Sequence, residues 1–294
     1  MQKTQGLIAA PPTGFQSDGS IDTAVVVPLA EHLHRQGLVG VFVNGTTGEG
    51  LSLNTEERET LALAWRKALP APMRLVVHVG HTSIAEACRL ADHAQRIGAD
   101  AGATIPPIFY KPAGIADVTG WCAAIAEAAP ELPFYYYHIP SMTGVPLAVA
   151  SFLEAAADRI PNLAGAKFTF ESLHDYLGCL RVCNGRFDVL WGRDEMLLGA
   201  LATGAQGCVG STYNVMAPIF LKLMDAFRNG DLERARDLQA RATAVILELG
   251  SRGCMFASLK ALLRAQGVPI DTRMRIPLRA PEASIRDLPE IPTD

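Results

Sequence analysis

The chain has 294 residues, of which 49% are hydrophobic and 19% are charged, and its formal net charge is −4. This length is ample for a large buried core, and single α/β barrels commonly take about 250 residues. The acidic balance and the lack of a basic run do not favour binding to nucleic acid or to an anionic membrane surface. An anionic small molecule is not excluded, because local donors bind such ligands.

The N-terminal segment and the cysteines indicate the compartment. Residues 1–10 contain one lysine and a short apolar patch, without the long apolar core and small-residue cleavage site of a signal peptide. No run of 18 or more apolar residues occurs, so we expect no membrane-spanning helix. No CxxC pair occurs, and we expect reduced, buried thiols at Cys88, Cys122, Cys179, Cys183, Cys208 and Cys254. We therefore expect a cytoplasmic protein.

Eight short apolar segments alternate with longer helical stretches. In chain order, the predicted strands are Gly6–Ala10, Gly40–Val43, Arg74–Val79, Ala99–Thr104, Pro133–Tyr137, Leu163–Phe168, Phe187–Trp191 and Gln206–Val209. They are nearly continuous in apolar character, as expected for strands covered on both faces. Two of the helices between them have recognisable starts: Asn54–Glu57 puts a cap and acidic residues in a first turn, and Ser83–Glu86 has the pattern of a capping box.

Eight such units with short connections predict a closed (β/α)8 TIM barrel. The chain continues after the eighth strand with extra helices expected at Asp231–Leu249 and Gly253–Gln266 and a proline-rich tail from Ile276. We expect one α/β domain over residues 1–294, with the barrel at about 6–228 and a C-terminal helical extension at about 229–294. An open doubly wound sheet is the alternative, but no GxGxxG motif follows the first strand and no break in composition divides the chain.

Active sites of such barrels lie at the C-terminal ends of the strands. Lys167 is the most informative residue there, because it alone of the six lysines lies inside an apolar strand-like segment. A buried ammonium group is costly unless it is paired or deprotonated. Desolvation lowers the pKa of a lysine and leaves the neutral amine that Schiff-base chemistry requires. The alternative is a lysine at a strand end whose ammonium group reaches solvent.

The turn Gly45–Glu49 offers the hydroxyls of Thr46 and Thr47 and several backbone N–H groups where a strand leads into a helix. Such converging donors can hold a carboxylate. The alternative is an ordinary glycine-rich turn without a ligand.

Tyr137 is the last of three consecutive tyrosines at the end of the fifth strand. Strand alternation places Tyr135 and Tyr137 on one face and Tyr136 on the other. A tyrosine at this place can transfer protons if its neighbours support the phenolate, since its free pKa is near 10. The alternative is an aromatic side chain that only fills the core.

Asp194 and Glu195 are adjacent carboxylates just past the seventh strand. They could accept hydrogen bonds from substrate hydroxyls, or they could cap the following helix. His78 and His81 could suggest a metal pair, but no cysteine or acidic ligand is spaced to match them. We therefore expect no metal and no other cofactor.

Together these motifs resemble the dihydrodipicolinate synthase and N-acetylneuraminate lyase family, the pyruvate-dependent class I aldolases. The resemblance rests on Gly45–Glu49, on Tyr137 shortly before Pro140, on the Gly-x-Lys that ends at Lys167, and on Gly210-Ser211. It extends roughly from Gly6 to Pro269, with the motifs in the expected order.

Within the family, the closer resemblance is to the lyase branch, particularly its animal type. It is carried by Leu132–Pro140, Gly165–Thr169, Gly192–Glu195 and Gly210–Asn214. The synthase branch has an arginine shortly after the strand-five proline, whereas here Ser141–Gly144 follow it. Some bacterial lyases have Ser at the position of Thr46 and Tyr at the position of Arg193.

The resemblance implies a role for each motif residue and a homotetramer of barrels. Lys167 would form the Schiff base, Tyr137 would move protons, and Thr46 and Thr47 would hold the substrate carboxylate at the catalytic centre. Thr169 would support the site. The expected contacts to the polyol chain of the substrate are Gly192, Asp194, Glu195 and Ser211. Tyr110, after the strand-four prolines, would reach into the site of a neighbouring subunit, as its counterpart does in some relatives.

The expected activity is that of a lyase acting on an oxo acid: reversible cleavage of N-acetylneuraminate to N-acetylmannosamine and pyruvate. Three alternatives remain open on sequence alone. The first is another aldolase or dehydratase of the family that acts on a 2-keto-3-deoxy sugar acid. The second is a catalytically silent barrel that senses a keto acid, and the third is a metal-dependent aldolase. The intact Lys167, Tyr137 and threonine pair speak against the second, and the missing ligand set speaks against the third.

Overall fold

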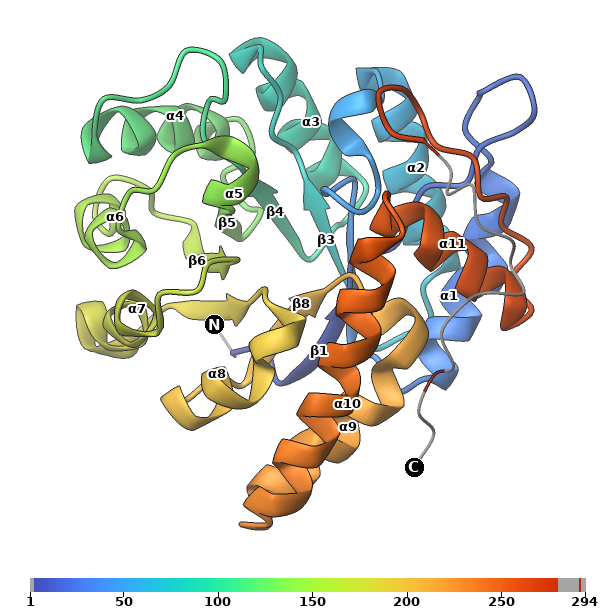
Figure 1. Cartoon of the computed structure of the whole chain (residues 1–294). Coiled ribbons are helices and arrows are strands. Elements are labelled where there is room, and N and C mark those ends of the chain that lie inside the picture. Colours follow the sequence, from blue (N-terminus) through green and yellow to red (C-terminus); the bar gives the residue numbers. More distant parts are fainter. Residues whose placement is uncertain (1–2, 280–290, 292–294) are drawn as a thin grey trace.

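The computed structural model describes residues 3–279 and residue 291, and its centre is a closed barrel of eight parallel strands (Figure 1). Each strand pairs with the next in chain order, and β8 pairs with β1. The strands are β1 (Gly6–Ala9), β2 (Gly40–Val43), β3 (Arg74–His78), β4 (Ala101–Thr104), β5 (Phe134–His138), β6 (Leu163–Phe168), β7 (Asp188–Trp191) and β8 (Gly207–Gly210). The predicted TIM barrel is confirmed, and every predicted strand end lies within two residues of the observed one.

Helices surround the barrel; those before β8 connect consecutive strands, and the last of them follows β8. They are α1 (Val26–Arg35), α2 (Thr55–Ala68), α3 (Ile84–Arg96), α4 (Ile115–Glu127), α6 (Val149–Ala156), α7 (Leu173–Gly185), α8 (Leu197–Thr203) and α9 (Tyr213–Arg228). Shorter turns of helix follow three of the strands: η2 (Gly50–Ser52) after β2, α5 (Pro140–Thr143) after β5 and η3 (Asp194–Met196) after β7. A further short turn, η1 (Thr23–Val25), leads into α1.

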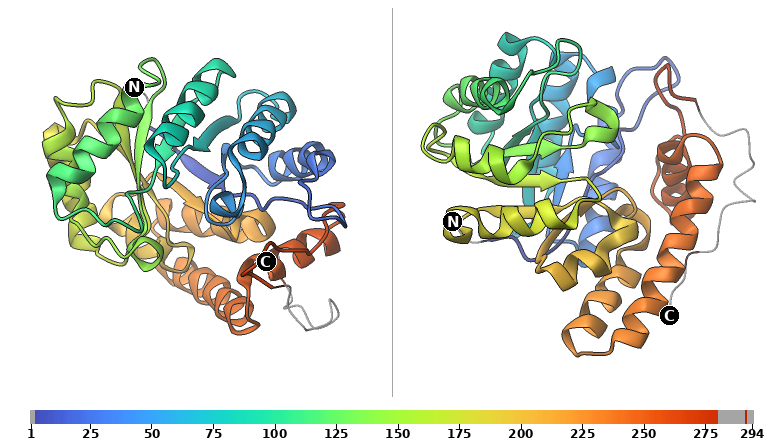
Figure 2. Two further views of the ribbon diagram at one scale, coloured as in Figure 1. Left: turned by 90° about the horizontal axis from the view of Figure 1, so that it is seen from above. Right: turned by 60° about the vertical axis from the view of Figure 1, so that its left-hand side comes forward.

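Two further helices follow the barrel, as expected. They are α10 (Leu232–Ser251), which packs along α9, and α11 (Met255–Ala265). Figure 2 shows both on one side of the barrel. The expected proline-rich tail begins within the described residues, at Ile276, and for the most part lies outside them. In the described chain, no single helix has the length and apolar character of a membrane span, and only the α10–α11 pair, bent by 115°, passes that test together.

The core has two parts, one inside the barrel and one between the strands and the helices. Tyr135 and Tyr137 belong to the inner part and Tyr136 to the outer part, so the predicted alternation is confirmed. The Tyr135 hydroxyl donates to Asp188 Oδ2 over 2.8 Å, on the side of the barrel interior toward the amino ends of the strands. Above it, toward the carboxyl ends of the strands, the interior holds Tyr137 and Lys167.

One predicted helix cap is confirmed and the other is wrong. Asn54 accepts from the Glu57 N–H, and the Glu57 carboxylate accepts from the Asn54 N–H, which completes a capping box at α2. Ser83 does precede α3, but among the described residues its side chain makes no capping bond. The acid of the expected box, Glu86, instead accepts from the Thr55 hydroxyl over 2.6 Å. The Glu86 carboxylate, which the local pattern paired with Ser83, is therefore bonded to Thr55 of the neighbouring helix α2.

All six cysteines are free thiols, as expected, but only three are buried. Cys122, Cys179 and Cys208 lie in the core, where burial raises the pKa of each thiol. Cys88, Cys183 and Cys254 are partly exposed, so the expectation of burial is wrong for these three. They lie in the outer layer, in α3, in α7 and just before α11, where a helix has only one face against the core.

Candidate active site

A cavity of about 170 Å³ opens at the carboxyl ends of the strands. It brings together all but one of the residues predicted for the site. These are Thr46, Thr47, Tyr137, Lys167, Thr169, Gly192, Asp194, Glu195 and Ser211. They come from the ends of β2, β5, β6, β7 and β8, as the rule for active sites in such barrels requires.

Lys167 lies on β6 with its side chain inside the barrel, and only 4% of it is exposed. Its Nζ is 4.0 Å from the centroid of the Phe42 ring and 4.1 Å from that of Tyr137, so its immediate neighbours are largely apolar. Burial lowers the pKa of Lys167 to about 7, although the charge of Asp194 opposes the shift. The lysine does not reach solvent as the alternative required, and a large share of the amine is neutral near pH 7.

Tyr137 stands in register with Lys167 on the neighbouring strand and is 2% exposed. Its hydroxyl lies 3.2 Å from the Thr46 Oγ1. Burial raises the pKa of Tyr137 to about 12, with the Thr46 hydroxyl opposing the shift. The phenol is therefore protonated at neutral pH, which makes it a proton donor before it can act as a base.

The turn between β2 and α2 is held tightly beside this pair. The Glu49 N–H donates to the Thr46 carbonyl and the Gly50 N–H to the Gly45 carbonyl, each over 3.1 Å. A Cβ at Gly50 would lie 1.8 Å from the Asn44 carbonyl oxygen, so only glycine fits. The turn directs two hydroxyls into the cavity, and Thr47 Oγ1 is 2.6 Å from Ser211 Oγ.

Asp194 is buried at the floor of the cavity. Its Oδ2 accepts from the Thr212 N–H over 2.9 Å and from the Thr212 hydroxyl over 2.7 Å. Within the described part of the chain its Oδ1 has no hydrogen-bond partner. Burial raises the pKa of Asp194 to about 6. The helix-capping alternative is wrong for this residue, because its carboxylate holds the loop after β8 instead of the helix that follows it.

Two glycines, Gly192 and Gly210, make room for the side chains of Thr169 and Asp194. A Cβ at Gly210 would lie 1.9 Å from Asp194 Oδ1, and a Cβ at Gly192 would lie 2.0 Å from Thr169 Oγ1. Neither clash could be relieved without moving a side chain of the cavity. The glycines of the two motifs are thus required by close approach of neighbouring strand ends.

Glu195 lies at the open end of the cavity and is engaged by a cation. Arg193 Nη1 is 3.2 Å from Glu195 Oε1, and the same guanidinium pairs with Glu171. The Arg193 and Glu195 side chains are 25% and 30% exposed, so water screens the pair only in part. Arg193 and Glu195 thus present one guanidinium and one carboxylate to the cavity, and both groups are able to bind hydroxyls.

Part of the cavity wall was missed by sequence reasoning. Ile139, Ser141 and Met142 follow β5 directly, so the rule for strand ends could have included them. Ile246, Met255 and Phe256 come from α10 and its junction with α11, and no local pattern marks them. A second cavity, of about 290 Å³, adjoins the first across Thr46 and Tyr137 and is lined mainly by apolar groups.

Tyr110 is the one predicted residue that the described chain does not bring to the cavity. It is 86% exposed and contacts the equally exposed Phe109 edge to face, with 5.0 Å between ring centroids. A role for Tyr110 in catalysis therefore needs a second copy of the chain, and it stays a prediction.

The two histidines considered as metal ligands bond within the protein. His78 Nδ1 is 3.0 Å from the Asn44 carbonyl oxygen, and desolvation holds the pKa of His78 well below its usual value. His81 Nδ1 accepts from the Ser83 N–H over 3.0 Å. Residues 3–279 and 291 contain no group of three or more His, Cys, Asp or Glu side chains arranged to hold a metal ion.

Comparison with known proteins gives consistent matches over nearly the whole chain. Residues 3–288 match the dihydrodipicolinate synthetase family. N-acetylneuraminate lyase A of Xenopus laevis is 39% identical over 280 residues, which are 94% of this chain and 91% of that protein. The human N-acetylneuraminate lyase is 37% identical over 293 residues, which are 98% of this chain and 91% of that protein.

Solved structures of similar sequence have the same fold. The N-acetylneuraminate lyase of Proteus mirabilis superposes with a TM-score of 0.93 at 38% identity, covering 97% of this chain and 96% of that one. The lyase of Aliivibrio salmonicida gives a TM-score of 0.94 at 40% identity, covering 97% of this chain and 94% of that one.

Proposed function

This chain belongs to the dihydrodipicolinate synthetase family, and on that basis we propose that it is a class I N-acetylneuraminate lyase. The reaction is reversible cleavage of N-acetylneuraminate to N-acetylmannosamine and pyruvate. The observation that carries the proposal is the pair of Lys167 and Tyr137 at the floor of the cavity. The apolar surroundings of Lys167 keep its amine nucleophilic, and the protonated Tyr137 lies directly beside it.

The first half of the reaction follows from these protonation states. The neutral Lys167 amine adds to the C2 ketone of the open-chain sugar acid and gives a carbinolamine. Tyr137 donates its proton to the hydroxyl that leaves as water, so that an iminium ion and a phenolate form together. The iminium charge stabilises a phenolate that burial alone disfavours. Two opposite charges thus arise side by side in a site from which water is largely excluded.

The carbon–carbon bond then breaks. The Tyr137 phenolate removes the proton of the C4 hydroxyl, the C3–C4 bond cleaves, and its electron pair moves into the iminium to give an enamine. N-acetylmannosamine leaves as the aldehyde, and Tyr137 is again a phenol. It returns the proton to C3, which regenerates an iminium on pyruvate. Water then adds to C2 and gives a proton to the Tyr137 phenolate, and the carbinolamine collapses to free pyruvate and the neutral Lys167 amine.

The rest of the cavity binds the two ends of the substrate. Thr46 and Thr47 present hydroxyls and turn N–H groups to the carboxylate, and Ser211 lies against Thr47. Asp194 and Glu195, which both line the cavity, accept hydrogen bonds from the polyol chain beyond C4. Thr169 and Gly192 shape the wall between these two ends. Carboxylates suit hydroxyl recognition, because hydrogen bonds to charged groups are the stronger kind.

The proposal extends to assembly and location. We infer a homotetramer, in which Tyr110 of one subunit faces the site of another, and action in the cytoplasm. The exposed Phe109 and Tyr110 rings support a protein contact, and the six free thiols suit a reducing compartment. Sedimentation velocity and cell fractionation test the two inferences separately.

The test of the reaction is covalent trapping at Lys167. The protein is incubated with pyruvate, reduced with borohydride and digested, and mass spectrometry should find the adduct on Lys167. Lys167→Arg should form no adduct and have little activity, because a guanidinium stays protonated. An adduct on another lysine would refute the assignment.

The substrate is tested separately from the chemistry. Pyruvate release from N-acetylneuraminate is compared with release from a panel of 2-keto-3-deoxy sugar acids at equal concentration. Preference for N-acetylneuraminate is expected. Preference for a short sugar acid would leave the Schiff-base aldolase in place and refute the lyase.

A further inference from the structure

A C-terminal strap, residues 271–278, crosses from α11 to the turn that carries Thr46 and Thr47. Its anchor on the turn is Glu49, whose side chain is fully buried. Glu49 Oε1 accepts from Lys260 Nζ of α11, and Glu49 Oε2 accepts from the Arg275 N–H of the strap, each over 2.8 Å. Both oxygens of one carboxylate therefore join the turn to the C-terminal part of the chain.

Lys260 fixes the strap as well as the turn. Its side chain is fully buried, and besides the bond to Glu49 it donates to the Arg273 carbonyl. The ammonium group also lies 4.6 Å from the centroid of the Phe15 ring. A buried ion pair whose other donors and acceptors are also hydrogen-bonded is held in one geometry. Removal of either partner would leave an uncompensated buried charge.

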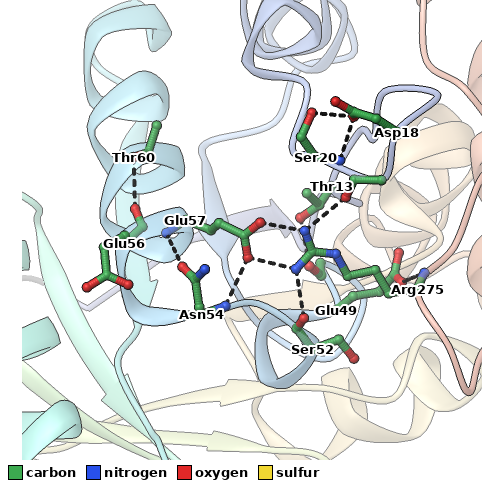
Figure 3. A network of polar contacts seen from close by, with 12 residues as sticks. Thr13, Asp18, Ser20, Glu49, Ser52, Asn54, Glu56, Glu57, Thr60 and Arg275 are labelled. Atoms are coloured by element: carbon green, nitrogen blue, oxygen red, sulfur yellow. Dashed lines mark hydrogen bonds and ion pairs between the residues drawn. The ribbon is translucent and has the colours of Figure 1, made fainter.

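The Arg275 side chain ties the same strap to the start of α2. Its guanidinium pairs with both oxygens of Glu57 and donates to the Ser52 and Gly19 carbonyls over 2.9 Å each. Figure 3 shows this guanidinium between Glu57 and Ser52, with Glu49 beside it. Such a fork of donors holds a planar partner more firmly than one ammonium group can.

The path from the strap to the catalytic hydroxyls is short. The Glu49 N–H donates to the Thr46 carbonyl, and Thr46 Oγ1 in turn lies 3.2 Å from the Tyr137 hydroxyl. Glu49 itself has a φ of 55°, a conformation that L residues rarely adopt, so its surroundings must hold it there. The bonds from Lys260 and Arg275 supply that restraint on the side of the turn away from the barrel.

We propose that Arg275 is a positioning residue, which acts through the strap and Glu49 to orient the Thr46–Thr47 turn for the carboxylate of the keto acid. This inference rests on the proposed function. Arg275 does not line the catalytic cavity within the described chain, so its effect on the reaction must be indirect. The effect should be specific to ligands that have a carboxylate.

The experiment measures trapping at Lys167 with two probes, pyruvate and acetone, which differ in the carboxylate. Arg275→Ala should raise the pyruvate concentration for half-maximal trapping by about tenfold. This is the loss expected when the misplaced turn no longer makes one of its hydrogen bonds to the pyruvate carboxylate. Trapping of acetone should stay within about threefold of wild type. Arg275→Lys should recover part of the pyruvate loss, since it keeps the charge but not the fork.

Arg66→Ala is the matched control. Arg66 also joins α2 to another segment, through Asp100 and the Gly98 carbonyl, and its side chain is 28% exposed against 24% for Arg275. Both variants remove one positive charge and one link from α2. Arg66→Ala should leave trapping of both probes unchanged, whatever it does to the melting temperature.

Three results would overturn the inference. One is an unchanged pyruvate concentration for half-maximal trapping in Arg275→Ala, and another is an equal loss with pyruvate and acetone. If Arg275→Ala does not fold, Arg275→Lys is the variant that decides. The third overturning result would be a wild-type pyruvate concentration for half-maximal trapping in Arg275→Lys. The proposed function fails in a different way, because wild-type protein would then form no pyruvate adduct on Lys167.

Discussion

Tyr137 and Lys167 are register partners on β5 and β6, and the Lys167 Nζ lies 4.1 Å from the centroid of the Tyr137 ring. The two side chains therefore enter the barrel at the same height and share one apolar environment. That environment lowers the pKa of the lysine and raises the pKa of the tyrosine. The proton donor and the nucleophile of the proposed mechanism are thus both in their reactive forms near pH 7.

The rate of Schiff-base formation with pyruvate should rise with pH and have its midpoint near the Lys167 pKa of about 7. Asp194→Asn removes a negative charge that raises the pKa of Lys167, so the midpoint should move to lower pH. Trapping rates across a pH series measure the shift. Asp92→Asn, an exposed residue of α3 paired with Arg96, is the control and should leave the midpoint in place. A midpoint that rises in Asp194→Asn would contradict the electrostatic account.

Tyr137→Phe should fold normally and lose at least about 100-fold in kcat, the lower end for a general acid–base group. The ring that packs against Lys167 remains, and only the hydroxyl near Thr46 is removed. Steady-state kinetics together with circular dichroism check this. Thr46→Val, which removes the neighbouring hydroxyl alone, should cost less. Activity of Tyr137→Phe within a few-fold of wild type would show that the tyrosine only fills the core.

Glu195→Ala should lower kcat/KM for N-acetylneuraminate roughly tenfold to hundredfold, the range for one lost hydrogen bond to a charged group. Pyruvate trapping should barely change, because pyruvate has no polyol chain. Glu171→Ala is the control, since Glu171 pairs with the same Arg193 but does not belong to the described lining of the cavity. Equal losses with both ligands in Glu195→Ala would mean that Glu195 supports Lys167 or the fold instead.

Tyr110→Phe and Tyr110→Ala separate two roles for this exposed residue. If the hydroxyl completes the site of a neighbouring subunit, Tyr110→Phe should lower kcat while sedimentation shows an unchanged assembly. Tyr110→Ala should lower activity further and loosen the assembly, because it also removes the exposed ring. A fully active monomer at assay concentration would refute a role across subunits.

Local signals were enough to predict the barrel and most of the residues that line the candidate site. The strands are short apolar segments between turns, and a lysine in one of them is conspicuous whatever surrounds it. Glu86 bonds to Thr55 and not, as predicted, to Ser83, because α2 and α3 are in contact. A local sequence pattern contains no information on that contact. The same holds for Phe256, which reaches the cavity because the chain bends by 115° between α10 and α11.

Within the described residues, Tyr110 is the predicted site residue that does not reach the cavity of its own chain. Its motif follows β4 as expected, yet the loop directs the ring into solvent. The strap was missed for a related reason, since Glu49 and Arg275 are far apart in sequence and a lone Glu in a glycine-rich turn gives no indication of its partner.

The glycines at positions 192 and 210 have a consequence for directed evolution of this barrel. Any substitution there would push Thr169 or Asp194 out of place, so a mutant library that varied these positions would mostly sample inactive variants. Met142 and Phe256 line both cavities, and their contribution is bulk rather than hydrogen bonding. Saturation at these two sites, with 192 and 210 kept as glycine, gives a small library. Under the proposed function, the shape of the accepted aldehyde can change in it while Lys167 and Tyr137 stay in place.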